Sequence, residues 1–214
     1  MRKFVALGLV FVILLFSMLT GCGNSVAKPT EPTETTETPP TPVGTLYVSF
    51  GAALEIVYDD AGNALELTGV NDAGKELANA KQDQLNKGCV YTLRSILRHA
   101  ITNELLGDAK TVAVRIGAND PLPADDFLSV IVQDCQYLVD EELAGVDMVG
   151  LAGDKLDQNG NLTYDTAKEL AGEYLGIDAV DLSGEEIPVG GVYTFTGGDR
   201  SCTVDAFTGL VIGQ

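Results

Sequence analysis

One apolar run near the start of the chain limits where the rest of it can fold. Residues Phe4 to Leu19 are almost wholly apolar, and they follow the basic pair Arg2 and Lys3. An apolar run of this length near the start of a chain is either a signal peptide or a single membrane span. No later stretch is apolar enough to cross a bilayer. We therefore expect everything after the run to fold outside the cytoplasm.

The residues that end the run favour a signal peptide. Leu19-Thr20-Gly21-Cys22 resembles the lipobox of bacterial lipoproteins, in which a small residue precedes the cysteine. The resemblance implies that residues 1–21 are removed and that Cys22 carries a diacylglycerol thioether and palmitate. Several acyl chains give stable anchoring at the extracytoplasmic face of the cell membrane without a membrane-spanning helix. The alternative is an uncleaved membrane helix with an incidental cysteine.

The segment after the cysteine has the composition of a linker. Residues 22–43 are dominated by Thr, Pro and Glu and nearly lack large apolar side chains. Such a segment cannot bury enough surface to offset its chain entropy, so we expect it to be disordered. At about 3.1 Å per residue it extends at most on the order of 65 Å. We interpret it as a stalk, with an unselected terminus as the alternative.

The charge of the chain excludes two classes of partner. Removing Arg2 and Lys3 from the 13 basic residues leaves 11 against 31 acidic ones, a net charge of −20. A charge this negative argues against nucleic acid and against anionic lipid headgroups as partners. It is typical of a soluble extracellular surface.

Three cysteines follow the anchor. Cys89, Cys135 and Cys202 are an odd number, so they cannot all pair within one chain. Each has apolar neighbours, which predicts buried structural thiols. One disulfide with one free thiol is the alternative.

The patterning of residues 44–152 predicts an α/β (α+β) domain with two helices packed on a mixed sheet. Period-two apolar alternation and turn residues between the segments predict strands. Apolar residues at helical spacing predict helices, the second with the stripe Phe127, Ile131, Cys135 and Leu138. The order is strands at 45–50, 54–58 and 64–70, a helix at 83–106, a strand at 110–116, a helix opening at Pro123 and a strand at 146–151.

A second pattern begins after residue 153 and predicts a small α-β-β-β module over residues 161–214. Thr163 is the expected cap of a helix over 164–175 that ends at Gly176, and Thr166 with Glu169 has capping-box spacing. Strands are expected at 178–182, 191–196 and 201–206, with a hairpin at 197–199. A turn at 205–209 then leads into residues 210–212.

Residues 44–152 resemble the extracytoplasmic middle domain of RsgI-type anti-sigma factors. The resemblance is carried by Tyr47-Val48-Ser49, Leu54-Glu55-Ile56, Asp60-Ala61-Gly62 and the run from Gly69 to Leu77. That family has a self-cleaving Asn-Pro pair where this chain has Gly51-Ala52. Because the asparagine side chain and the proline amide are missing, we expect no self-cleavage. The cytoplasmic sigma-binding segment and the membrane helix are also missing, so a direct anti-sigma role is not expected.

Residues 161–214 resemble a PepSY module. The resemblance is carried by the segment from Leu162 to Ala171 and by the segment from Val204 to Val211, which contains an Asp-x-x-Thr-Gly turn. It implies a non-catalytic module associated with peptidase regulation or with cell-envelope proteins.

No residue set predicts catalysis, a cofactor or a metal site. His99 is the single histidine and is expected at the surface or half-buried, and neither GxSxG nor HExxH occurs. Adjacent acids such as Asp59 and Asp60 are expected on solvated faces. The segment 155–166 resembles a calcium loop at Asp157, Asn159, Gly160 and Leu162, but Lys155 and Thr166 replace the carboxylates of positions 1 and 12.

The sequence therefore predicts a lipid-anchored extracytoplasmic binding or sensing lipoprotein without catalytic activity. The candidate partners are an envelope protein, a peptidase or a polysaccharide. The alternative function is a regulator or inhibitor of an extracellular peptidase that acts through residues 161–214. An enzyme with a carboxylate site drawn from distant segments is a third interpretation.

Overall fold

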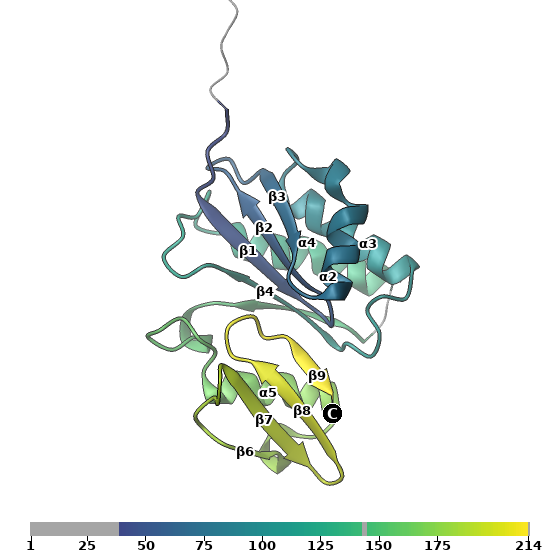
Figure 1. Cartoon of the computed structure of the whole chain (residues 1–214), viewed down its shortest axis with the longest axis vertical. Helices are drawn as coiled ribbons and strands as arrows, with labels where there is room; N and C mark the ends of the chain where they lie inside the picture. The colour runs from purple at the N-terminus through teal and green to yellow at the C-terminus, as the bar shows by residue number, and fades with distance from the viewer. Residues whose placement is uncertain (1–38, 143–144, 214) are drawn as a thin grey trace, which may run out of the picture. The chain divides into compact units, whose positions relative to one another are not determined.

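The computed structural model describes residues 39–142 and 145–213, which belong to one compact unit beginning at Pro39. Its centre is a five-stranded sheet with the order β3-β2-β1-β4-β5 (Figure 1). The pairs β3-β2, β2-β1 and β1-β4 are antiparallel, and β4-β5 is parallel. The strands are β1 (Gly44–Ser49), β2 (Ala53–Tyr58), β3 (Ala64–Gly69), β4 (Thr111–Ile116) and β5 (Asp147–Leu151).

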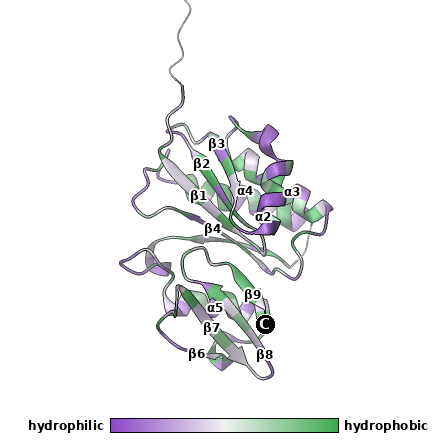
Figure 2. Ribbon diagram, in the orientation of Figure 1, coloured by the Kyte–Doolittle hydropathy of each residue, from purple (hydrophilic) through white to green (hydrophobic). Residues whose placement is uncertain are grey.

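Three helices cover one face of this sheet: α2 (Asp72–Ala80), α3 (Cys89–Thr102) and α4 (Phe127–Glu142). Their apolar sides form one core with the residues of β1, β2 and β4 that face them, among them Leu46, Ile56 and Val114. Figure 2 shows α2 as largely hydrophilic, and only Gly74, Leu77 and Ala78 of this helix are buried.

The other face of β4 and β5 contacts the C-terminal module. This module comprises α5 (Tyr164–Leu175) and an antiparallel sheet with the order β6-β7-β8-β9. Ala113 of β4 and Leu151 of β5 belong to the same apolar core as Leu170 of α5 and Phe195 of β7. The strands are β6 (Ser183–Gly184), β7 (Val192–Gly197), β8 (Arg200–Asp205) and β9 (Val211–Gly213).

The α+β class and most of the predicted elements are confirmed. The stripe of α4 is buried at Ile131, Cys135 and Leu138. Thr163 caps α5 by accepting a hydrogen bond from the Thr166 amide at 3.3 Å, and Gly176 ends the helix with φ of 64°. Thr166 therefore lies inside the helix, so its predicted capping box with Glu169 is wrong.

Helix α2 has no counterpart among the predicted elements, which pass from a strand at 64–70 directly to a helix at 83–106. Asn71 is its N-cap, and its side-chain oxygen accepts from the amides of Gly74 at 2.8 Å and Ala53 at 3.0 Å. Its side-chain nitrogen donates to the Gly51 carbonyl at 2.8 Å. One asparagine thus fastens the start of α2 to the β1–β2 turn, which is a contact that local sequence does not reveal.

Several predicted boundaries are also wrong, including the start of α4 at Phe127 rather than at Pro123. Helix α3 starts at Cys89 rather than near residue 83, because Gln82–Gln84 is a 3₁₀ turn and Asn86 adopts a positive φ of 63°. Residues 178–182 are not a strand. The Asp178 side chain accepts from the Val180 amide at 3.2 Å and closes a 3₁₀ turn, η3 (Ala179–Asp181), so the first strand of the module shrinks to Ser183–Gly184.

Candidate functional site

The C-terminal module is attached to the central sheet by the turn that carries the PepSY resemblance. Asp205 shapes this turn by accepting hydrogen bonds from the amides of Phe207 at 3.0 Å and Thr208 at 2.6 Å. Ser49 of β1 donates its hydroxyl to the Thr208 carbonyl at 2.8 Å, and the ring of Tyr47 meets that of Phe207 edge-on at 5.0 Å. The most specific part of the resemblance is therefore used in an internal contact, which we call the module junction.

Arg115 of β4 lies fully buried at the module junction. Its guanidinium stacks on the Phe207 ring at 4.1 Å and donates from Nη1 to the Phe207 carbonyl. Its Nε and Nη2 have no hydrogen-bond partner among the described residues. Burial lowers the pKa of Arg115, and the nearby Tyr47 and Asp205 oppose that shift.

An exposed apolar and acidic surface lies at the opposite edge of the C-terminal module, beside β6. We call it the β6 surface and define it as the lining of a shallow hollow of about 420 Å³. Ile187 and Val189 line this hollow with 77% and 73% of their surface exposed, and Val180 of η3 is 77% exposed. No other large apolar side chain among the described residues is as exposed. The lining is Ser183, Gly184, Glu185, Ile187, Val189, Val192, Thr194 and Thr196.

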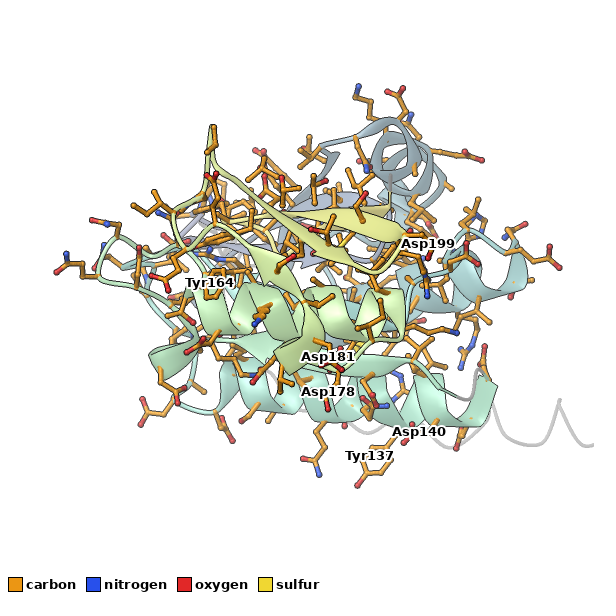
Figure 3. The ribbon with its side chains drawn as sticks, turned by 90° about the horizontal axis from the view of Figure 1, so that it is seen from below. Tyr137, Asp140, Tyr164, Asp178, Asp181 and Asp199 are labelled. Atoms are coloured by element: carbon orange, nitrogen blue, oxygen red, sulfur yellow. The ribbon has the colours of Figure 1, made fainter. Side chains whose placement is uncertain are left out.

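Acidic side chains accompany these apolar ones. Glu185 and Glu186 are exposed in the loop after β6, and Asp178 and Asp181 are exposed on the η3 turn before it (Figure 3). Among the described residues, β6 lies at the edge of its sheet and pairs with β7 alone. Its two carbonyls, of Gly184 and Ser183, already accept from the Tyr164 hydroxyl at 3.3 Å and the Thr196 hydroxyl at 3.4 Å, so the surface is defined by its side chains rather than by a free strand edge. Sequence reasoning missed this surface, although apolar residues within the Gly- and Pro-containing loop from Ile187 to Gly191 were a signal for it.

The structure tests the predicted cysteines in part. Cys89, Cys135 and Cys202 are buried and free, as the apolar neighbours predicted, so no pair of them forms a disulfide. Burial raises the pKa of Cys89 and of Cys135 to about 12 and that of Cys202 to about 11. These thiols are packing groups with little nucleophilic character. Cys22 lies outside the described residues.

Asp59 corrects the prediction that adjacent acids lie on solvated faces. It is 6% exposed, and its carboxylate accepts from the amides of Asn63 at 2.7 Å and Ala61 at 3.1 Å. Burial opposes ionisation, but these hydrogen bonds outweigh it and lower the pKa of Asp59. The carboxylate therefore closes the β2–β3 turn.

The other positions that the sequence singled out lie in separate parts of the structure. Gly51 has a φ of 91° in the β1–β2 turn, and Ala52 is buried beside it. In the calcium-like loop, one carboxylate oxygen of Asp157 accepts from the amides of Asn159 at 2.8 Å and Asn161 at 2.9 Å, so that oxygen is occupied by the loop itself. His99 is half-buried on α3, as predicted.

The described residues contain neither a metal-ligand cluster nor a membrane-spanning helix. Residues 39–142 and 145–213 contain no group of three or more His, Cys, Asp or Glu side chains placed to hold a metal ion. In the same ranges no helix has the length and hydropathy of a membrane span.

No family model matches the chain, and no curated protein matches it.

Proposed function

We propose that this chain is a lipid-anchored extracytoplasmic binding or sensing lipoprotein without catalytic activity, and that its β6 surface binds a protein partner. The observation that carries the proposal is the exposure of Ile187 and Val189 on that surface, with Val180 similarly exposed on the η3 turn that precedes β6 in the chain. Exposed apolar residues concentrated in this way are typical of interaction sites.

The chemistry of the β6 surface defines the partner. Apolar side chains of the partner would contact Ile187 and Val189, which line the hollow and are exposed. Basic residues beside those side chains would face Glu185 and Glu186, which are exposed. The expected partner is therefore an envelope protein with an apolar and basic segment.

The anchor and stalk support the same function from the sequence. The lipobox at Cys22 implies attachment at the outer face of the membrane, and residues 22–43 have the composition of a spacer. A binding head on such a spacer reaches envelope components that a directly anchored domain would not.

A regulator or inhibitor of an extracellular peptidase is the second candidate. The observation that favours it is the position of the β6 surface on residues 161–214, the part that resembles PepSY modules. In this case the partner that docks on β6 is the peptidase itself.

The test is site-specific photo-crosslinking in cells that express the full chain, with the photoreactive residue at Thr194 beside Ile187. Ile187→Asp with Val189→Asp should abolish the cross-linked product. Tyr137→Asp is the matched control, because Tyr137 is 59% exposed on α4 and is not part of the lining of the β6 surface. If the Ile187→Asp, Val189→Asp variant gave as much cross-linked product as Tyr137→Asp, the proposal would be contradicted. A purified cross-linked partner whose peptide hydrolysis changes on adding the chain would establish the second candidate.

A further inference from the structure

The solvent side of α3 carries a concentration of positive charge that the proposed function does not use. After Cys22 the chain has 11 basic residues, and four of them lie between positions 81 and 98. They are Lys81, Lys87, Arg94 and Arg98, and His99 follows directly. In a chain with a net charge of −20 after the anchor, such clustering is not expected from solubility alone.

Most of these residues line one hollow of about 640 Å³, which we call the α3 hollow. Lys81 enters it from the end of α2, and Arg94 and Arg98 enter it from successive turns of α3. Lys87 stands beside it, with Nζ 5.1 Å from the ring centre of the lining residue Tyr91. The lining is Lys81, Gly88, Val90, Tyr91, Arg94, Ser95, Arg98, His99, Thr102 and Asp134.

The positive charge in the α3 hollow is only partly neutralised. Arg98 Nε is 2.9 Å from a carboxylate oxygen of Glu142 on α4. Among the described residues, neither Lys81 nor Arg94 has an acidic oxygen within ion-pair distance, and Asp134 is the single acid in the lining. Arginines one turn apart repel each other and destabilise a helix. A bound anion would remove that repulsion.

The start of α3 adds to the positive potential. Gly88 is its N-cap residue and lines the hollow, no side chain caps the helix, and its first turn contains no acid. The Cys89 amide donates to the Gly62 carbonyl at 2.8 Å, and the Asp59 carboxylate is close enough to help raise the pKa of Cys89, so the positive end of the helix dipole is partly compensated.

We propose that the α3 hollow binds a phosphate-bearing anion, held by Arg94 and Arg98 with Lys81 opposite them. A guanidinium donates two parallel hydrogen bonds to phosphate oxygens, and the Ser95 and Tyr91 hydroxyls supply further donors. The phosphate belongs to a polymer of the envelope, because the net charge of −20 argues against approach to an anionic lipid surface; a lipid headgroup is the other outcome that the test distinguishes. The α3 hollow is separate from the β6 surface, so the proposal for either site can be refuted without affecting the other.

The test measures binding of the chain from residue 23 onward to a fluorescent polyphosphate and to vesicles of phosphatidylcholine with and without phosphatidylglycerol. Arg94→Gln combined with Lys81→Gln should weaken polyphosphate binding at least about 10-fold, since each removes a charge-assisted hydrogen bond. Lys75→Gln is the matched control, because Lys75 is exposed on α2 and pairs with Asp72. This control should change binding less than about twofold, and thermal unfolding of all variants checks that they fold.

The two arms distinguish the source of the phosphate. Arg94-dependent binding to phosphatidylglycerol vesicles assigns it to a lipid headgroup, and Arg94-dependent binding to polyphosphate alone assigns it to a polymer. No binding to either probe, or binding that Arg94→Gln with Lys81→Gln leaves unchanged, overturns the proposal.

Discussion

The packing of Arg115 at the module junction leads to a quantitative prediction about what stabilises the contact between the central sheet and the C-terminal module. Replacing Arg115 with methionine removes two buried nitrogens, Nε and Nη2, that have no partner among the described residues. Each buried donor without a partner lowers the free energy of unfolding by roughly 1–3 kcal/mol, so removing both should raise it by about 2–6 kcal/mol. The same change also destabilises the fold. Losing the hydrogen bond to the Phe207 carbonyl lowers the free energy of unfolding by about 1.5–3 kcal/mol, and losing the contact with the Phe207 ring lowers it by about 0.5–2 kcal/mol. The opposing effects nearly cancel.

Arg115→Ala should behave differently, because it also removes the long aliphatic stem and leaves a cavity. Deleting a buried side chain of that length costs about 2–5 kcal/mol. We therefore expect Arg115→Met to lie within about 1 kcal/mol of the unaltered chain and to be at least about 2 kcal/mol more stable than Arg115→Ala.

Urea unfolding at pH 7 of the chain from residue 23, followed by circular dichroism, gives both free energies of unfolding. If Arg115→Met is as unstable as Arg115→Ala, the charge rather than the stem stabilises the module junction, and the reasoning is refuted.

Two further predictions concern the core. Gly74→Ala should lower the free energy of unfolding, measured in urea, by more than about 2 kcal/mol, because an added Cβ would lie 2.0 Å from the Ala53 carbonyl oxygen. Gly88→Ala is the control and should change it by less than about 1 kcal/mol, because a Cβ at Gly88 meets no atom within 4 Å. Equal effects of the two substitutions would argue against the close approach of α2 to β2. Burial raises the pKa of Cys89 and Cys135 to about 12 from the ordinary 9.0, so the unfolded chain loses these protons first and each thiol should lower stability by about 1.4 kcal/mol per pH unit above pH 9. Urea titrations between pH 8 and 10.5 measure this loss, which should be shallower in the Cys89→Ala, Cys135→Ala variant; identical slopes would contradict burial of the thiols.

Elements with strong local signals were predictable from the sequence. The alternation over Thr45–Phe50 and the stripe through Ile131 and Leu138 each identify a buried face, and the structure contains both. Thr163 and Gly176 mark the two ends of α5 because capping is a local interaction.

Features that depend on distant contacts were not predictable. Asn71 reads as a turn residue, and its role as a cap becomes clear only when Gly51 and Ala53 are placed against it. Arg115 interrupts the apolar alternation of β4, and nothing local shows that Phe207, 92 residues later, stacks on it. The candidate sites share this property, because the α3 hollow combines residues of α2, α3 and α4.

The central claim is that a lipid on Cys22 anchors this chain at the extracytoplasmic face of the cell membrane. The most direct test is the intact mass of the protein extracted from membranes, with Cys22→Ala measured alongside. The account predicts a chain that starts at Cys22 with the mass of a diacylglycerol group and its acyl chains, and a Cys22→Ala variant that carries no lipid. A mass without lipid, or one that still includes residues 1–21, would contradict the anchor. Fragments that divide at Gly51-Ala52 would instead support the self-cleaving anti-sigma interpretation.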